Sequence, residues 1–298
     1  MFRRKKFWLA TLVPLALLGI FPVPSSALAG LGKKQARKLI AGLGGAKLPT
    51  SAVRVKTITQ TSLGAEAIIE VETAFRLIQN DEGRWQLVEI RTGPDQWEEI
   101  GLLAEAANRQ LPKTDCELPE LSVPLATEKV SRCLIANLLG IRLPSDSVRI
   151  RSLSGFGLPF ASNPSTLAVA LITFQARFGK ERGSWRVLEL RAGDTEWLKV
   201  EPTLAAFEAE KRKRAHRDLE TMARALEAFR RDHGSYVITD KHRVLIDHLS
   251  PHFLAPIIRF DPWHNPYAYQ GERDRFWLRS SGPDGKENTS DDLVLNRL

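Results

Sequence analysis

An alternation of apolar and charged residues is the first clear pattern in the chain. Between positions 69 and 77 the apolar residues are Ile69, Val71, Phe75 and Leu77, and Glu70, Glu72 and Arg76 stand between them. Successive side chains of a strand point to opposite faces, so this pattern predicts a half-buried strand. A turn at 80–83 and a second run at 85–91 extend the prediction to a β-hairpin.

Amphipathic helices are expected before this hairpin and again later in the chain. Residues 33–43 and 127–139 carry apolar positions at helical spacing, and a glycine, Gly45 or Gly140, follows each segment closely. Glycine accepts the positive φ that commonly closes a helix. Strands are expected after the Leu-Pro dipeptide that follows each glycine.

The chain repeats itself at an offset of 95 to 100 residues. The clearest recurring positions in the first copy are Leu39, Ile40, Ala41, Gly45, Leu48, Pro49, Val53, Arg54, Gly83, Trp85, Glu89, Arg91, Gly93 and Trp97. The offset grows by five residues, which indicates an insertion around 155–163. Positions kept in both copies are those that a shared fold requires. We therefore expect the repeated Trp, Glu and Arg residues to support packing and the hairpins rather than catalysis.

A different pattern begins after Trp197. Apolar residues at Ala215, Leu219, Met222, Leu226 and Phe229 form one stripe at helical spacing. This stripe predicts a long amphipathic helix from about Pro202 to Asp232, ended by Gly234. The basic residues at 211–214 and 217 are interpreted as a solvated face of this helix rather than as a nucleic-acid site.

These patterns together predict an α+β protein of several small domains. We divide it into a signal peptide at 1–29, a first α+β repeat at 30–110, a proline-containing linker at 111–125, a second α+β repeat at 126–200, and a domain at 201–298 that joins the long helix to a small antiparallel sheet.

The N-terminus has the features of a secretory signal. Arg3 to Lys6 precede an apolar stretch at 7–23, and Ala27-Leu28-Ala29 offers small residues at the positions that a signal peptidase reads. Cleavage after Ala29 would leave no stable membrane span, and the alternative is an uncleaved anchor. Either way the protein is exported to the periplasm or beyond. The basic stretch supplies half of the formal net charge of +8, so the rest of the chain does not demand a nucleic-acid partner.

Two cysteines occur in the chain, Cys116 and Cys133. In an oxidising compartment they could form a disulfide, and the alternative is two separate buried thiols.

Three motif blocks near the C-terminus resemble a known family. They are Asp218-Leu219 with Ala225-Leu226, Phe229, Asp232, Gly234 and Tyr236; the run Asp261 to Tyr269; and the run Ser280 to Gly285 continuing to Asp291-Asp292-Leu293. In this order and spacing, residues 213–298 resemble the head domain of the G-type major pseudopilin of type II secretion (general secretion pathway protein G). The resemblance implies a pilin-like head and partners among proteins of secretion or pilus-like machinery.

The sequence departs from that family at several points. The family usually has Gly where His264 and Asn288 stand, and Pro where Val237 stands. Asn tolerates the left-handed conformation, so the turn at Asn288 can persist. Pseudopilins also begin with a long apolar stem helix, whereas here two other modules precede the head. Packing into a filament through a stem is therefore not expected.

The loop at 280–292 is the one segment with ligand chemistry. It gathers carboxylate, amide and hydroxyl oxygens, the donors that Ca²⁺ prefers, although the spacing is not that of an EF-hand. The resemblance implies a calcium site using Asp284 and Asp292 with main-chain carbonyls, and Asp291 and Ser290 are weaker candidate ligands. The alternative is a solvated acidic turn.

Functional alternatives follow from what the chain contains. All six histidines lie between 216 and 264, which leaves a zinc hydrolase conceivable, but the sequence has no H-E-x-x-H, nucleophile elbow or phosphate loop. The favoured interpretation is a non-enzymatic structural or interaction protein associated with type II secretion. The alternative is an extracytoplasmic protein that binds a ligand or peptide on its two repeats.

Overall fold

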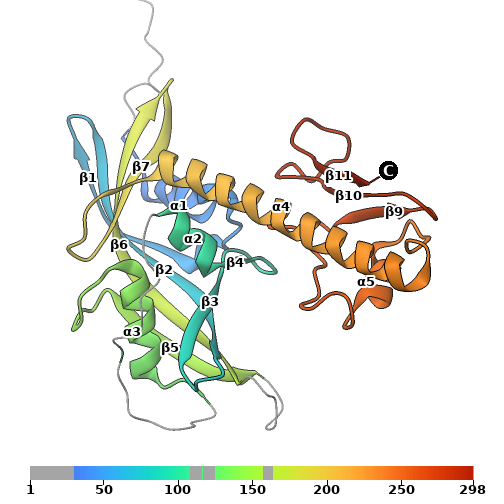
Figure 1. The fold of residues 1–298 in the computed structure, drawn as a ribbon. Coiled ribbons are helices and arrows are strands. Elements are labelled where there is room, and N and C mark those ends of the chain that lie inside the picture. Colours follow the sequence, from blue (N-terminus) through green and yellow to red (C-terminus); the bar gives the residue numbers. More distant parts are fainter. Residues whose placement is uncertain (1–29, 108–115, 117–124, 157–163, 298) are drawn as a thin grey trace, which may run out of the picture. The chain divides into compact units, whose positions relative to one another are not determined.

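The computed structural model describes residues 30–107, 116, 125–156 and 164–297 (Figure 1). The predicted signal peptide at 1–29 lies outside the described residues. So do the predicted linker at 111–125, apart from Cys116 and Leu125, and most of the predicted insertion at 155–163.

Each repeat begins with one helix, and the strands that follow have similar lengths in the two copies; the first repeat also ends in a second helix. The first comprises α1 (Lys33–Ala41), β1 (Val53–Thr61), β2 (Gly64–Gln79), β3 (Trp85–Arg91), β4 (Trp97–Glu99) and α2 (Ile100–Ala106). The second comprises α3 (Glu128–Leu139), β5 (Val148–Phe156), β6 (Ser165–Glu181), β7 (Ser184–Ala192) and β8 (Leu198–Lys199). The α+β class, the two helices and the β2–β3 hairpin predicted from the pattern are thereby confirmed.

The first helix ends earlier than the sequence analysis predicted. Helix α1 stops at Ala41, and a 3-10 turn at Leu43–Gly45 follows it. Gly44 and Gly45 both have positive φ, so the glycine-rich stretch forms a turn instead of a last helical turn. In the second copy Gly140 closes α3 in the left-handed conformation, as expected.

Strands of both repeats belong to one eight-stranded antiparallel sheet. The order is β4-β3-β2-β6-β7-β8, with β1 also paired to β2 and β5 to β6. Val53 pairs with Val71, its repeat counterpart Val148 pairs with Ile172, and Val71 pairs with Ile172. Equivalent residues thus face each other in the central β2–β6 pair, and an approximate twofold relation connects the repeats.

Each hydrophobic core of the sheet combines both repeats. One core joins α1, β1 and the first half of β2 to Ala176, Phe178 and Val187 of the second repeat. The other joins α3, β5 and the first half of β6 to Phe75 and Leu77 of the first repeat. We call these the α1 half and the α3 half of the sheet. The repeat boundaries remain a prediction, but neither core could be completed by one repeat alone.

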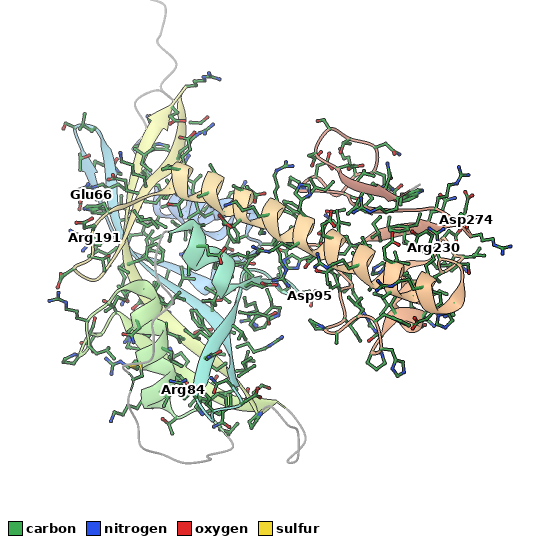
Figure 2. All side chains as sticks on the ribbon, in the orientation of Figure 1. Glu66, Arg84, Asp95, Arg191, Arg230 and Asp274 are labelled. Carbon is green, nitrogen blue, oxygen red and sulfur yellow. A yellow bond between two sulfur atoms is a disulfide. The ribbon has the colours of Figure 1, made fainter. Side chains whose placement is uncertain are left out.

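The repeated Glu and Trp positions make the same contacts in both copies, in each case with an arginine of β2 or β6. Arg76 pairs with Glu89 at 2.6 Å and lies 4.9 Å from the ring centre of Trp97. Arg177 pairs with Glu189 at 3.0 Å and lies 3.9 Å from the ring centre of Trp197. Glu66 and Arg191 lie in the same region of the sheet (Figure 2). These groups brace the hairpins, in agreement with the predicted supporting role.

Cys116 and Cys133 form a disulfide, with their Cα atoms 6.0 Å apart. The bond joins Cys116, which lies between the two repeats in the sequence, to α3. Closing a loop of this length stabilises a fold by about 3 kcal/mol in the chain-entropy model.

The C-terminal domain is built on one long helix. Its elements are α4 (Val200–His233), α5 (His242–Leu249), β9 (Ala268–Gly271), β10 (Phe276–Ser280) and β11 (Leu293–Arg297). The predicted stripe from Ala215 to Phe229 is buried and packs against α5 and the three strands, and Gly234 closes α4 with φ of 78°. Within the described part of the chain, no helix is both long enough and apolar enough to span a membrane.

The first half of α4 packs against the first repeat. Lys211 is 5% exposed, and its ammonium lies 2.9 and 3.0 Å from the two carboxylate oxygens of Glu98 on β4. His264 Nε2 lies 3.4 Å from the same carboxylate. One turn further along α4, Arg214 pairs with Glu99 at 3.0 Å. The end of β4 is therefore tied by ion pairs to the helix that carries the C-terminal domain.

Candidate functional site

The turn at 261–265 is organised around one buried carboxylate. Asp261 is 3% exposed, and its Oδ1 accepts hydrogen bonds from the backbone N–H of Trp263 at 3.0 Å and of Asn265 at 2.8 Å. Its Oδ2 accepts the hydroxyl of Ser280 at 2.5 Å. This carboxylate fixes both its own turn and the end of β10.

The three motif blocks meet through side chains. Tyr267 donates its hydroxyl to Asp218 on α4 at 3.1 Å, and burial raises the pKa of Tyr267, as does the neighbouring carboxylate. Asn265 donates to the carbonyl of Gly282 at 2.8 Å, and Asp261 holds Ser280. The blocks therefore form one hydrogen-bonded frame that positions the first residues of the acidic loop.

Three carboxylates of this loop converge on one hydroxyl. Thr289 Oγ1 lies 2.7 Å from Asp291 Oδ1, 3.3 Å from Asp292 Oδ1 and 3.4 Å from Asp284 Oδ1. A hydroxyl donates a single proton, so it cannot satisfy three anionic oxygens at once. Backbone N–H groups also face these carboxylates, from Lys286 to Asp284 and from Asn288 to Asp292, both at 2.8 Å.

A buried arginine lies at the base of the loop. Arg279 on β10 is 9% exposed, pairs with Glu287 at 2.6 Å and donates to Asn288 Oδ1 at 3.1 Å. Its Nε lies 4.0 Å from Asp292 Oδ2 without a hydrogen bond. Arg279 lies on β10 and therefore neutralises part of the negative charge of the loop from the side of the sheet. Asp284 is exposed.

The hydrogen bond from Thr289 lowers the pKa of Asp291, and the backbone N–H of Asp284 lowers it further. Asp291 is therefore held in its charged form at neutral pH.

The structure brings together three of the four predicted loop residues. Asp284, Asp291 and Asp292 all face Thr289, whereas Ser290 is exposed and stands outside this group. Sequence analysis missed Thr289 and Arg279, the residues on which the carboxylates converge. Thr289 could have been suspected, because its hydroxyl stands among the same oxygen donors.

The loop fits the chemistry of a calcium site without forming a finished cage. In the described part of the chain, no group of three or more His, Cys, Asp or Glu side chains is arranged to hold a metal. Three hard carboxylates close to one hydroxyl are nevertheless donors suited to Ca²⁺, which readily adds carbonyl and water oxygens. The donor set therefore agrees with calcium, provided that main-chain or water oxygens complete it.

The departures from the pseudopilin family are accommodated locally. Asn288 and His264 both adopt positive φ, of 63° and 69°, as the glycines usual at these positions could. The main-chain carbonyl of Val237, which a proline would also supply, accepts the Tyr269 hydroxyl at 2.7 Å. His264 adds a contact that glycine could not make, since its ring faces Glu98.

Three of the six histidines, His233, His242 and His264, lie in different surroundings. His233 stacks on Phe229 with ring centres 4.0 Å apart, and His264 faces Glu98. Burial, together with the charge of Arg259, lowers the pKa of His242 to about 4. These surroundings give no support to the hydrolase alternative.

Comparison with known proteins finds a family that the C-terminal domain resembles. Residues 203–296 match the family described as Type II secretion system (T2SS), protein G. This match confirms the resemblance found in the sequence, and its span begins near the start of α4. No curated protein and no solved structure matches the chain.

Proposed function

We propose, from the family match of residues 203–296, that this chain is an exported, non-enzymatic envelope protein that associates with type II secretion machinery through its C-terminal head. The observation that carries the proposal is the frame joining Asp218, Asp261 and Ser280. The residues that resemble the family also position the acidic loop. We therefore expect this loop to belong to the surface that a partner protein contacts.

The first half of α4 is unsuited to filament packing. It carries Glu208, Glu210 and the basic run at 211–214, and Lys211 forms an ion pair with Glu98. A charged helix already packed on the first repeat cannot act as an apolar stem. We therefore assign partner contact to the exposed surface of the head and not to α4.

In vivo photo-crosslinking tests this association. A photoreactive residue at Val294 of β11, which is 53% exposed, should crosslink to components of the secretion machinery. The matched control is Ile68 on the sheet, which is 39% exposed and should not give these products. Mass spectrometry identifies the partners. Products that persist unchanged after deletion of the secretion genes, or that contain no secretion component, would reject the association.

Calcium binding by the loop is the second part of the proposal. Asp284 and Asp292 would hold the ion, with Asp291 beside them and main-chain oxygens completing the set. Bound calcium would remove the mutual repulsion of these carboxylates and join the two ends of the loop. Ser290 is assigned no role beyond that of a weak candidate.

We expect Ca²⁺ to raise the melting temperature of residues 30–298. A ligand that binds only the folded state stabilises it by about 2.7 kcal/mol at a hundredfold excess over Kd. Mg²⁺ should act much more weakly, because it demands octahedral geometry and resists dehydration. Calorimetry with Ca²⁺, Mg²⁺ and chelator measures the effect, and Asp284→Ala/Asp292→Ala should abolish it. A calcium response equal in parent and variant, or none in the parent, would leave only a solvated acidic turn.

A further inference from the structure

The first described residues of the chain are strongly basic. Residues 30–65 contain seven lysines and arginines, and the first acid of the chain is Glu66. The formal net charge of the whole chain is +8, of which residues 1–29 supply four and residues 30–65 seven, so residues 66–298 are net negative, at −3. The positive charge is therefore concentrated in α1, β1 and the loop between them.

Four of these cations lie on one side of α1. They form two pairs at a spacing of four residues, Lys33 with Arg37 and Lys34 with Lys38. Residues at this spacing lie side by side on a helix, and the two pairs are adjacent to each other. Ile40 is buried against the sheet, whereas the three lysines are exposed. We call these four cations the basic α1 surface.

The basic α1 surface has no acidic partner among the described residues. None of its four side chains takes part in an ion pair there, and Lys33 donates only to the main-chain carbonyl of Lys56, at 2.9 Å. The buried Nε of Arg37 makes no hydrogen bond in the described part of the chain. The charge of these residues is therefore not used in holding the fold together.

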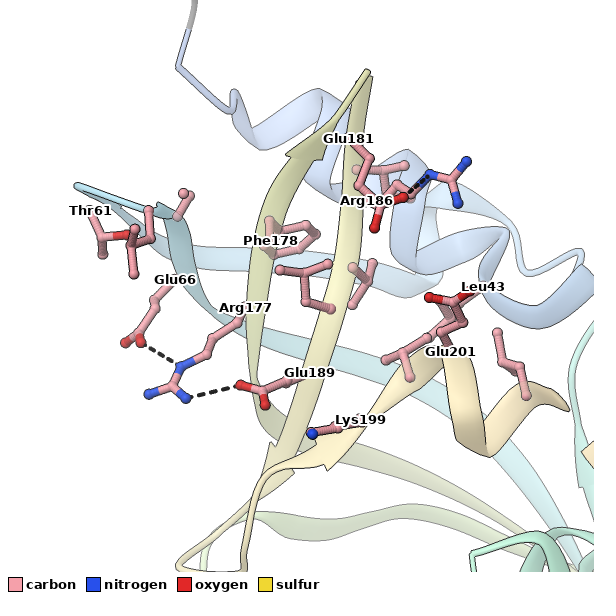
Figure 3. A pocket seen from close by; sticks show the side chains of 18 of the residues that line it. Leu43, Thr61, Glu66, Arg177, Phe178, Glu181, Arg186, Glu189, Lys199 and Glu201 are labelled. Carbon is pink, nitrogen blue, oxygen red and sulfur yellow. Dashed lines mark hydrogen bonds and ion pairs between the residues drawn. The ribbon is translucent and has the colours of Figure 1, made fainter. Parts of the chain in front are cut away.

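The acids of the α1 half are mostly paired with arginines of the strands (Figure 3). Glu66 lies 2.8 Å from Arg177, and Glu181 lies 3.2 Å from Arg186. Among the described residues labelled in that view, Glu201 at the start of α4 is the only acid without such a pair. One free carboxylate cannot balance four cations, so the surface keeps a net positive charge.

The placement of the four cations opposes the stability of α1. Like charges four residues apart repel each other on a helix, and Lys33 and Lys34 stand in the first turn, where the helix dipole disfavours cations. No acid stands in that turn, and Gly32 supplies no side-chain cap. A local arrangement that weakens its own helix is expected where function, and not folding, selects the residues.

Helix α3 shows that the shared fold does not require this charge. By the repeat alignment, Lys33 corresponds to Glu128 and Lys38 to Cys133. Thr127 caps α3 through its side chain, and an acid stands in its first turn. The net charge of α3 is +1, against +4 for α1.

The chemistry of the surface favours an extended anionic partner. Three of its four cations are lysines, which act as point charges on flexible stems, whereas a single shaped anion is usually held by the planar fork of arginine. A phospholipid surface presents many mobile anionic head groups, and these attract clusters of Lys and Arg.

An exposed apolar side chain lies close to the start of α1. Gln60, near the end of β1, exchanges two hydrogen bonds with the backbone of Leu31, at 3.3 and 3.1 Å. Leu63, in the turn that follows, is 92% exposed. Basic residues beside exposed apolar ones are typical of segments that lie in a membrane interface, whereas binding to nucleic-acid phosphates depends on the cations alone.

We propose that the basic α1 surface and Leu63 bind the anionic head groups of a phospholipid membrane, so that the first repeat rests on the membrane surface. The lysines approach the head groups, and Leu63 enters the interface. The inference rests on the envelope location in the proposed function. Binding to vesicles is measured on the purified protein, so it can fail or succeed independently of the crosslinks to secretion machinery.

Vesicle flotation tests the proposal. Residues 30–298 are mixed with vesicles of phosphatidylglycerol and phosphatidylcholine in equal parts, or of phosphatidylcholine alone, and leaving out residues 1–29 excludes binding through their apolar stretch. Binding should be confined to the anionic vesicles and should be lost at about 1 M salt, where the Debye length falls to about 3 Å. Lys33→Gln/Lys34→Gln/Lys38→Gln should bind about a hundredfold more weakly, at about fivefold for each lysine.

The matched control is Lys129→Gln/Arg142→Gln/Arg151→Gln, which removes three exposed cations of the second repeat and changes the net charge equally. It should bind nearly as tightly as the parent. The α1 variant should melt no lower than the parent, because fewer like charges remain on the helix, so its lost binding cannot be attributed to unfolding. Equal loss in both variants, or no preference for anionic vesicles, would overturn the proposal.

Leu63→Ser separates a membrane from a nucleic acid as the partner. It should weaken vesicle binding about tenfold, because an apolar side chain no longer leaves water, and it should leave any binding to duplex DNA unchanged. Parental vesicle binding by Leu63→Ser, together with equally tight binding of duplex DNA at matched phosphate concentration, would assign the surface to nucleic acid and overturn the proposal.

Discussion

Replacing Asp261 by alanine will unfold the C-terminal domain while the eight-stranded sheet stays folded. The carboxylate is 3% exposed and accepts hydrogen bonds from Trp263, Asn265 and Ser280. Alanine leaves these donors without an acceptor in a buried site, and each unsatisfied donor costs about 1–3 kcal/mol. We expect a loss of at least about 3 kcal/mol, a large part of the stability of a small domain.

Asp261→Asn removes the negative charge of the side chain and keeps nearly the same shape, so it tests the contribution of the charge alone. The amide oxygen can still accept from the two backbone N–H groups, and its nitrogen can donate to Ser280. We expect a loss of about 1 kcal/mol, because hydrogen bonds to a charged group are roughly twice as strong as neutral ones. The order of stability should therefore be parent, then Asn, then Ala.

Hydrogen–deuterium exchange with mass spectrometry locates the effect of Asp261→Ala. Protection should fall in β9, β10 and the acidic loop, and remain in β2 and β6. The exposed Asp247 on α5 provides a matched control, since Asp247→Ala should leave exchange unchanged. An Asp261→Ala variant with parental protection in β10, or with equal loss in β2, would contradict the role assigned to this carboxylate.

Local patterns were sufficient to predict most of the elements. The alternation at 69–77 and the stripe from Ala215 to Phe229 both depend on residues close in sequence, and both describe the structure well. The small antiparallel sheet expected after the long helix is likewise present, as β9, β10 and β11. These features follow from backbone periodicity and turn chemistry, which a single sequence displays.

Long-range pairing could not be predicted in the same way. The sequence showed two copies of one module, but nothing in it indicated that β2 and β6 would join them or that each core would be shared. Glu70 shows the consequence. Alternation placed it on the polar face, yet it is 2% exposed and pairs with Lys56 at 2.9 Å and with Arg149 of the other repeat at 2.7 Å. Burial works to raise the pKa of Glu70, but these cations lower it overall.

In the candidate site, too, some features could be predicted from the sequence and others could not. Asp284, Asp291 and Asp292 were found because acidic residues cluster in sequence. Their convergence on Thr289 depends on loop geometry, and the burial of Glu70 depends on contacts between the two repeats. A single sequence carries no direct record of such contacts.

Replacing Lys211 by methionine will strongly destabilise the junction between α4 and the first repeat. Lys211 and Glu98 have side chains that are only 7% and 14% exposed, and their charged groups lie 2.9 Å apart. Removing one partner of a buried ion pair leaves the other charge uncompensated, which typically costs about 3–5 kcal/mol. His264 Nε2, which lies 3.4 Å from the Glu98 carboxylate, remains as a partner in this variant. We therefore expect the loss of stability to be near the lower end of this range, about 3 kcal/mol.

The double variant Lys211→Met/Glu98→Gln decides whether charge is the cause. With both charges removed, the desolvation penalty disappears, and stability should return to within about 1 kcal/mol of the parent. The pair Lys213–Glu210, on the same helix, is a control, because Lys213 is exposed and Lys213→Met should change little. Urea unfolding is measured for the parent, Lys211→Met, Glu98→Gln, Lys211→Met/Glu98→Gln and the control Lys213→Met. Single variants that add to the double-variant loss would mean that Lys211 acts through packing on Phe207, 4.6 Å from its ammonium, and not through Glu98.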